Sequence, residues 1–441
     1  MNEASNDYRS RLLKLFVPIM ISNLISQIQG LIDRIFLGRI DVIYMSAVSN
    51  ALAPVWTTMS LVFSLSIGSS ILISQSVGAG KTEKAREYAA SLMVWHNILP
   101  VVLFIFWTFF SRPVYLMMGV SENVIGLCVT YTRYFAPIFI LTGIEVTGVV
   151  ILQTSNNTKP LVWYGIIRSG LNVLLDYLLI FGKWGFPKMG IAGAALATTL
   201  AEFLGLAYVL VMIIKDKNLL TMPGRKEILN ADIKPYAKSL KLGVNSALEE
   251  FAWNFGNLMI IRILNTINEN AAGIYTIAFA MEGIVFSIVG AIGNGTVTLT
   301  GEATGSKDLK TYKSITKTAM LWSVLASALS LALCVIFPEQ ILSMFTTDET
   351  IITTSSIYLV LVGINFFSKS GNVIWGNAIR GYGDTKWMFY TQICGTVLVI
   401  INAYLFVKVF KVGMIGVFFA VLLDEFLRAI VNRIRYGKIK F

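Results

Sequence analysis

The sequence predicts an all-α polytopic membrane protein with twelve transmembrane helices in two six-helix lobes, related by a pseudo-two-fold axis along the membrane normal. Three observations lead to this fold class. The 441 residues are 55% hydrophobic and only 14% charged, long apolar segments recur along the whole chain, and the second half repeats motifs of the first. A soluble globule of this length needs more polar side chains to cover its surface, so the composition favours a membrane protein.

Twelve apolar segments account for the helices. Each is long enough to cross about 30 Å of hydrocarbon. Because backbone in lipid must satisfy its own hydrogen bonds, and because no ten-residue alternating pattern of a β-barrel occurs, the segments are predicted to be helical. They cover residues 12–38, 50–77, 88–111, 129–153, 160–182, 190–214, 239–264, 271–299, 314–337, 354–378, 387–407 and 412–432. The apolar run from Leu12 is too long for a signal-peptide core, so no cleavable signal is expected.

The basic residues predict the orientation of the chain. With the N-terminus inside, 25 of the 36 Lys and Arg residues fall in cytoplasmic segments. Six fall on the other side, namely Arg39, Arg112, Lys183, Lys188, Lys408 and Lys411. The positive-inside rule therefore places both termini in the cytoplasm of a multi-pass protein of the cell inner (plasma) membrane. The net charge of +11 is explained by topology, so nucleic-acid binding is not expected.

Internal repeats predict the two lobes. The matching segments are 78–85 with 303–310, 151–181 with 377–406, and 188–203 with 411–426. Six helices per repeat make both halves enter the membrane in the same sense, as in transporters with parallel repeats. The predicted domains are an N-terminal lobe at 1–214, a cytoplasmic linker at 215–238 and a C-terminal lobe at 239–441. Two matched lobes suit alternating access, which a receptor or an enzyme does not need.

Several motifs resemble a known family. The segments "FVPIMISNLISQIQGLIDRIFLGRI" (16–40), "NVLLDYLLIFG" (172–182), "GIAGAALAT" (190–198) and "AIRGYGDTK" (378–386) resemble multidrug and toxic compound extrusion (MATE) transporters of prokaryotes. The resemblance covers roughly residues 12 to 432 and favours the DinF-like subgroup over the NorM-like subgroup. It implies that organic substrates leave the cell in exchange for H⁺ or Na⁺.

The same resemblance implies a coupling site in the first lobe, formed by Asp33, Asn172, Asp176 and Thr198. Asn172 and Asp176 are four residues apart and share one face of a helix. An ionised carboxylate near the bilayer centre costs about 2.5–3.5 kcal/mol on insertion scales, so these acids should face a cavity or a partner. They could carry a proton or, with Na⁺ coupling, ligate the metal ion through Asp33, Asn172 and Asp176. The structural alternative is an ion pair between Asp176 and Arg168.

The repeats differ at these positions. Asn172 and Asp176 fall opposite Val399 and Ala403, and Asp33 falls opposite an aliphatic position near Ile260. Residues needed only for packing should more often occur in both lobes. The asymmetry therefore indicates a task that one lobe performs.

Further charged residues are candidates for the substrate cavity. Glu145 and Glu282 are solitary acids within apolar segments and could attract cationic substrates. Glu249 and Glu250 lie in the seventh helix, where another MATE subgroup has a functional glutamate. Lys369 stands where that subgroup has an aspartate, which argues against a second acidic ion site. We expect Lys369 to pair with Glu249 or Glu250.

These observations predict a secondary active antiporter that exports organic compounds, amphipathic and often cationic, by alternating access. No zinc spacing, P-loop, Rossmann glycine pattern or catalytic triad occurs, so we expect neither an enzyme nor a cofactor, and the coupling ion is H⁺ or Na⁺. The partners expected are small-molecule substrates and the lipid bilayer, and the protein is expected to be a monomer.

Alternatives from two classes remain open: another kind of transporter, and a channel or signalling protein. A lipid-linked saccharide flippase of the same superfamily should have a more cationic cavity and extra helices. A membrane channel should conduct ions without counter-transport, and a signalling protein should add a soluble domain, which is not apparent in this sequence.

Overall fold

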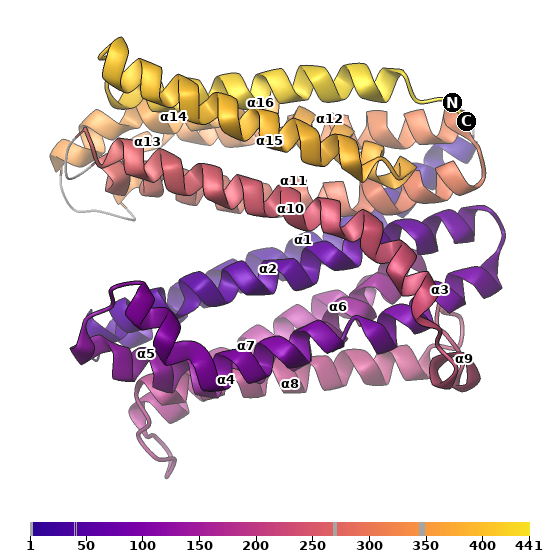
Figure 1. Ribbon diagram of the computed structural model, residues 1–441, viewed down its shortest axis with the longest axis horizontal. Helices are drawn as coiled ribbons and strands as arrows, with labels where there is room; N and C mark the ends of the chain where they lie inside the picture. The colour runs from indigo at the N-terminus through magenta and orange to yellow at the C-terminus, as the bar shows by residue number, and fades with distance from the viewer. Residues whose placement is uncertain (1–2, 39, 41, 268–270, 344–348) are drawn as a thin grey trace. The chain divides into compact units, whose positions relative to one another are not determined.

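The computed structural model describes residues 3–38, 40, 42–267, 271–343 and 349–441, and these residues form helices without any strand (Figure 1). Arg39, which the charge count assigns to the outer side, lies outside the described residues. The helices of the first half are α1 (Glu3–Gly38), α2 (Val42–Gly78), α3 (Thr82–Trp95), α4 (Ile98–Met117), α5 (Glu122–Phe135), α6 (Ile138–Thr154), α7 (Lys159–Phe181) and α8 (Ile191–Lys215).

The second half of the chain begins with a short linker helix and ends near the C-terminus. Its elements are α9 (Arg225–Leu229), α10 (Ile233–Leu264), α11 (Ala271–Gly305), α12 (Leu309–Ile336), α13 (Pro338–Ser343), α14 (Glu349–Tyr382), α15 (Thr385–Tyr404), the π-helical turn η1 (Leu405–Val409) and α16 (Met414–Gly437).

Two predicted helices are each interrupted once. The segment predicted at 88–111 is divided between α3 and α4, and the segment at 129–153 between α5 and α6. Pro100 lies in the first turn of α4, just after the first break, and Pro137 lies in the second break. Proline has no backbone N–H, so each removes the hydrogen bond to the carbonyl group four residues earlier. The α5–α6 pair is bent by 42°.

Among the described residues, nine helices are long and apolar enough to cross a membrane, or ten when the bent pair counts as one span. Helices α10 and α16 have 32 and 24 residues, which is long enough, but they carry many charged side chains. These are, within the predicted spans, Lys241, Glu249, Glu250 and Arg262 of α10 and Asp424, Glu425 and Arg428 of α16. With these two helices the count reaches twelve, and the predicted all-α polytopic fold is confirmed.

The chain divides into two compact units. One contains residues 17–73 and 81–243, and is called the N-terminal lobe below; the other contains 1–16, 74–80 and 244–441, and is called the C-terminal lobe. In the N-terminal lobe α7 packs along α8, whereas in the C-terminal lobe α14 packs against α11, α12 and α16 (Figure 1).

The first residues of the chain belong to the C-terminal lobe because ion pairs and hydrogen bonds hold them there. Arg11 Nη2 lies 2.5 Å from Glu302 Oε2. Gln75 Nε2, near the end of α2, donates to the carbonyl oxygen of Gly381 at 2.9 Å. Helices α1 and α2 therefore each pass from one compact unit into the other.

The linker before α10 is anchored at the break between α3 and α4. Ser91 Oγ donates to the carbonyl oxygen of Asp232 at 2.7 Å, and Trp95 Nε1 donates to that of Ala231 at 3.1 Å. The buried His96 ring places Nδ1 3.2 Å from the hydroxyl oxygen of Tyr236. The break thus provides the polar groups that fix the linker to the N-terminal lobe.

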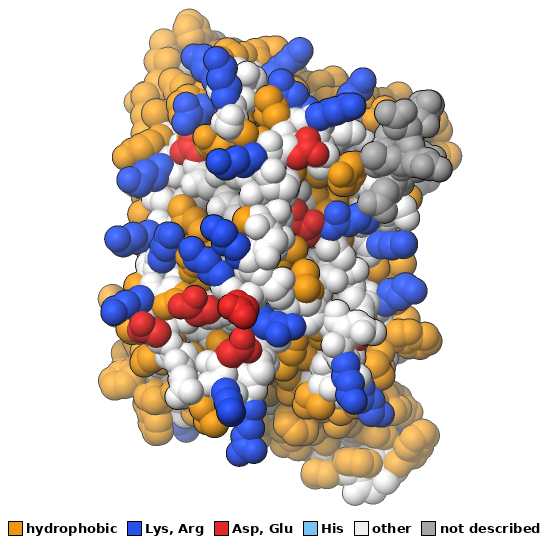
Figure 2. Space-filling view, turned by 90° about the vertical axis from the view of Figure 1, so that its right-hand side faces the viewer, with side chains coloured by type: hydrophobic (Ala, Val, Ile, Leu, Met, Phe, Trp, Pro, Cys, Tyr) orange, Lys and Arg blue, Asp and Glu red, His pale blue; other side chains and the backbone are white. Residues whose placement is uncertain are grey.

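Each lobe has a region rich in exposed basic side chains. In the N-terminal lobe these include Arg225 and Lys226 of α9, and in the C-terminal lobe Arg433 and Lys438 at the end of α16. In Figure 2 the Lys and Arg side chains outnumber those of Asp and Glu. The positive-inside rule assigns such regions to the cytoplasmic side of a membrane.

Candidate functional site

A buried polar cluster lies within the N-terminal lobe, and we call it the acidic cluster. Its members come from three helices: Gln29 and Asp33 from α1, Asn172 and Asp176 from α7, and Thr198 from α8. In both pairs the residues are four apart and therefore share one helix face. Asn172 and Asp176 are each only 1% exposed. The four residues expected from the sequence at the coupling site are thus brought together.

The amide of Asn172 connects the members of the acidic cluster. In the orientation that satisfies its neighbours, the amide nitrogen donates to Asp33 Oδ1 at 2.9 Å and to Asp176 Oδ2 at 3.3 Å, and the amide oxygen lies 3.2 Å from Thr198 Oγ1. Gln29 Nε2 also donates to Asp33 Oδ2 at 3.4 Å. Among the described residues no group bonds to Asp176 Oδ1. One amide therefore holds the two carboxyl groups next to each other.

This arrangement is chemically suited to take up a proton or a hard cation. Buried carboxylates are costly unless they are compensated, and two neighbouring carboxylates repel each other. The Asn172 N–H groups compensate part of that charge. The oxygen atoms of Asp33, Asp176 and Thr198 are ligands of the kind that hard cations prefer. Asp176 Oδ1 offers a buried acceptor that a proton can occupy.

Two members of this network were missed in the sequence. Gln29 supports Asp33, and Ser169 Oγ donates to Gln29 Oε1 at 3.0 Å. A signal was present, because Gln29 precedes Asp33 by one helical turn and Ser169 precedes Asn172 by three residues. Both are polar residues on the faces that carry the acidic cluster.

The alternative ion pair between Arg168 and Asp176 is not found. Arg168 Nη1 lies 3.2 Å from Glu202 Oε2 on α8, and its Nη2 donates to Ser26 Oγ. The hydroxyl group of Tyr164 donates to the other oxygen of the same glutamate. Arg168 and Asp176 are eight residues apart, and the neighbouring helix supplies Arg168 with a closer acid. Asp176 is therefore available for the acidic cluster.

Glu145 was expected to be a solitary acid, and this expectation is wrong. It lies on α6 beside the ion pair of Arg168 with Glu202, where it interacts with both of these residues and with Tyr164. Glu145 looks solitary in the sequence because these polar partners lie on α7 and α8, and not on its own helix.

The corresponding positions of the C-terminal lobe are apolar. Ile260, Val399 and Ala403 are 3%, 5% and 0% exposed and belong to one buried hydrophobic cluster. No carboxylate could ionise there without a large desolvation cost. The acidic cluster therefore has no acidic counterpart at the three matching positions.

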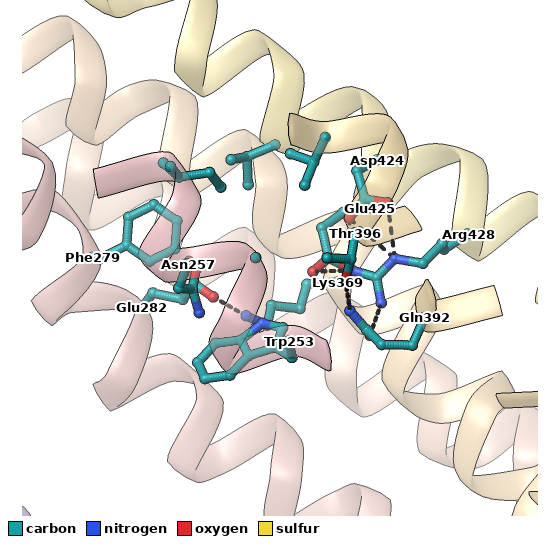
Figure 3. Close-up of a pocket in the computed structure, with 14 residues that line it drawn as sticks. Trp253, Asn257, Phe279, Glu282, Lys369, Gln392, Thr396, Asp424, Glu425 and Arg428 are labelled. Carbon is teal, nitrogen blue, oxygen red and sulfur yellow. Dashed lines mark hydrogen bonds and ion pairs between the residues drawn. The ribbon is translucent and has the colours of Figure 1, made fainter. Parts of the chain in front are cut away.

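The C-terminal lobe has a different polar recess, which opens between α10, α11, α14, α15 and α16 (Figure 3). The expected partners of Lys369 are wrong: its ammonium group pairs with Glu282 of α11, so Glu282 is not solitary. Glu249 instead pairs with Arg380, with Arg380 Nη2 2.5 Å from Glu249 Oε1. Glu250 follows Glu249 on the same helix and is half-buried. Partner choice here depends on helix rotation, which sequence spacing does not show.

Arg428 occupies the other end of this recess and is bound on all sides. Its Nη2 lies 2.8 Å from Asp424 Oδ2 and 2.9 Å from Glu425 Oε1. Its Nη1 donates to Gln392 Oε1 at 2.6 Å, and Nε donates to Asp424. Asn372 Nδ2 completes the network by donating to Glu425 Oε2 at 2.9 Å. This group of side chains is a closed structural network.

The two repeated lobes correspond to a known protein family. The family model MatE matches the chain twice, at residues 18–178 and 246–405. The chain belongs to the MatE family. The double match covers one segment in each lobe, as the internal repeats predict. The members of this family are multidrug efflux transporters, and the protein is a multi-pass membrane transporter.

Similar proteins of the MatE family align with nearly the whole chain. A probable multidrug resistance protein NorM from Thermotoga maritima is 25% identical over 430 residues, which cover 96% of this chain and 91% of that protein. An uncharacterized transporter YisQ from Bacillus subtilis is 26% identical, with 90% and 89% covered. A solved outward-facing multidrug resistance MATE transporter has a TM-score of 0.88 at 20% identity, with 98% and 96% covered. These names give the expected DinF-like subgroup no support.

The two MatE repeats exchange an arginine and a glycine. The repeat alignment pairs Arg168 with Gly395 and Gly205 with Arg428. A Cβ atom on Gly205 would lie 3.1 Å from Arg168 Cβ, and one on Gly395 would lie 2.7 Å from Arg428 Cδ. In each lobe, then, an arginine packs over a glycine of the neighbouring helix and binds the glutamate that both repeats share. The charge is the same in both lobes, but it comes from opposite helices.

This exchange predicts the effect of a methyl group at residue 395. Gly395→Ala places that methyl group against the Arg428 and Asp424 side chains. We expect a loss of about 1–3 kcal/mol in the free energy of unfolding, as for other overpacked sites. The matched control is Gly170→Ala in α7, where no atom lies within 4 Å of the new methyl group.

Thermal unfolding of both glycine variants in detergent measures the difference. Gly170→Ala should be neutral or stabilising by up to about 1 kcal/mol, because alanine favours the helix. Equal melting temperatures of the two variants would contradict the packing argument.

Proposed function

We propose that this MatE protein is a secondary active antiporter that exports amphipathic, often cationic, organic compounds in exchange for a coupling ion. The observation that supports this most is the acidic cluster: Asp33 and Asp176 from two helices share the amide of Asn172, and the matching positions of the other lobe are apolar. The names of the relatives, multidrug resistance proteins and transporters, are in keeping with this cargo.

Ion uptake at the acidic cluster can change how α1 packs on α7. With both acids ionised, Asn172 donates to each of them and connects the two helices. A proton on either carboxyl group turns an acceptor into a donor, which removes one of these bonds and lowers the local negative charge. The free energy of ion binding alone can shift the equilibrium between two packings that differ by such a contact. The protein would release its substrate outside in one packing and take up the ion in the other.

The arrangement favours H⁺ over Na⁺ as the coupling ion. The hydrogen-bond pattern around two ionised carboxyl groups assigns the Asn172 nitrogen, and not its oxygen, to their side, and an N–H group repels a metal cation. The buried Asp176 Oδ1 accepts no hydrogen bond among the described residues. A proton can bind there without rearrangement, whereas Na⁺ requires the amide to rotate before Asp33, Asn172 and Asp176 can ligate it.

Proteoliposomes with separately imposed gradients test this function. A fluorescent organic cation is the probe, and its movement is followed with a proton gradient alone and with a sodium gradient alone. We expect the proton gradient to drive transport against the concentration of the probe and the sodium gradient to have no effect. Transport driven by sodium at equal pH would refute proton coupling. Ion conductance without probe movement would support a channel instead.

We infer that the basic regions at α9 and at the end of α16 are cytoplasmic, that both termini lie on the cytoplasmic side of the inner membrane, and that the protein works as a monomer. Neither a flippase nor a channel is favoured by the family.

A further inference from the structure

The recess of the C-terminal lobe contains two cations with very different surroundings (Figure 3). Arg428 is held by Asp424, Glu425 and Gln392 through all three of its nitrogen atoms. A ligand would therefore have to displace several bonds to reach Arg428.

Lys369 and Glu282 form a pair that is incompletely satisfied. An ammonium group has three N–H donors, and one carboxylate, that of Glu282, pairs with it. Glu282 is only 4% exposed, lines the recess, and its Oε2 bonds to no group among the described residues. A buried carboxylate oxygen without a donor is costly. The pair thus has N–H donors of the Lys369 ammonium group and one oxygen of the Glu282 carboxylate left to offer a ligand.

Aromatic rings border this pair. The Lys369 ammonium lies 6.0 Å from the ring centroid of Trp253 and 5.3 Å from that of Phe286, and Phe279 lines the recess. Trp253 and Phe286 are 38% and 48% exposed, so their faces are accessible. An apolar ligand body can lie on these rings while its polar group enters the recess.

The charge of the pair determines which polar group fits. A ligand with only a positive charge competes with Lys369 for Glu282 and takes from the buried ammonium group the one carboxylate that pairs with it directly. A ligand with only a negative charge leaves Glu282 in the same state. Separating a buried ion pair in this way is strongly unfavourable. A ligand with both charges provides a new partner for each side chain, so neither charge is left alone.

We propose that Lys369 and Glu282 form a binding site for small organic zwitterions, with the ligand carboxylate at Lys369, the ligand ammonium at Glu282 Oε2 and the ligand body on Trp253 and Phe279. This substrate class deepens the proposed export function and rests on it only for transport, because binding requires no gradient. The site lies within one lobe and uses no residue of the acidic cluster.

Three ligands of one carbon framework test the proposal. Phenylalanine is the zwitterion, phenethylamine the cation and 3-phenylpropionate the anion, and equilibrium dialysis with the purified protein in detergent measures their dissociation constants. We expect phenylalanine to bind at least about tenfold more tightly than either of the others. Equal or tighter binding of phenethylamine or 3-phenylpropionate would overturn the proposal.

Variants assign each ligand charge to its side chain. Lys369→Met should reduce phenylalanine binding to the level of phenethylamine, and Glu282→Gln should reduce it to the level of 3-phenylpropionate. The charge exchange Lys369→Glu with Glu282→Lys should restore the preference for the zwitterion. Because this double variant keeps both charges, it tests the proposal even if a single variant fails to fold. Arg112→Met, which changes an exposed side chain of the other lobe, is the control. An unchanged preference in both single variants would refute the site.

The failure of this proposal can be told apart from the failure of the proposed function. Binding preference without gradient-driven transport would refute the antiporter and retain the site. Gradient-driven transport of the organic cation, with no preference for phenylalanine in dialysis, would refute the site and retain the antiporter.

Discussion

Replacing Asp33 and Asp176 together with asparagine is expected to abolish transport driven by an ion gradient. Both acids accept a hydrogen bond from the Asn172 amide. Asparagine has a similar shape but binds no proton and carries no charge. Intramembrane acids of this kind mark ion pathways, so we expect gradient-driven transport in proteoliposomes to fall by about tenfold or more. Exchange of the substrate without a gradient should be less affected, because the asparagine pair retains the packing.

The control for this experiment is Asp216→Asn. Asp216 follows α8, and its Oδ2 accepts from Asn157 Nδ2 at 2.8 Å, away from the acidic cluster. This variant should transport like the wild type. If the double variant also transports at the wild-type rate, the assignment of the coupling site to the acidic cluster is wrong.

Replacing Arg428 with methionine is expected to cause the largest loss of stability. This arginine compensates two buried acids at once, since Asp424 is 7% exposed and Glu425 is 5% exposed. Methionine fills similar space but leaves both carboxyl groups without their cation. Removing one partner of a buried ion pair costs about 3–5 kcal/mol. Thermal unfolding in detergent, followed by intrinsic fluorescence, should show a clear fall in melting temperature.

A matched arginine exists on the surface. Arg112 lies 3.7 Å from Glu122, and their side chains are 63% and 73% exposed. Arg112→Met should therefore cost less than about 1 kcal/mol. Neutralising the acids in the Arg428→Met background, with Asp424→Asn and Glu425→Gln, should recover part of the loss. The same melting temperature for the two arginine variants would contradict the buried-network argument.

Much of the fold could be predicted from composition and periodicity. The apolar segments, their helical character and the repeat follow from the lipid environment, because a membrane-spanning chain must bond its own backbone. The interruptions at Pro100 and Pro137 were not predicted, although proline was visible at both positions. Proline is tolerated in membrane helices, so its presence alone does not show where a helix ends.

The candidate site could be predicted in part. Asn172 and Asp176 share a face because they are four residues apart, and this rule acts within one helix. That Asp33 meets them depends on the rotation and depth of α1 against α7, and only the resemblance to a family indicated it. The structure places these side chains together, while their role in coupling stays a prediction.

The partners of charged residues were the weakest predictions. Lys369 was expected to meet Glu249 or Glu250, and it pairs with Glu282. The residues of such a pair lie on different helices, and a rotation of one helix by a single residue moves a side chain by about 100°. The spacing of residues along the sequence does not predict how one helix is rotated against another.

The sequence by itself determined that this protein is a repeated bundle of membrane helices and which residues are too polar for lipid, because the cost of burying charge and backbone depends on each residue alone. The tertiary structure alone decided which of those residues meet: the acids at Asn172, the glutamate of Lys369, and the arginine that occupies opposite helices in the two lobes. Such contacts depend on the rotation and register of packed helices, and these are properties of the whole lobe.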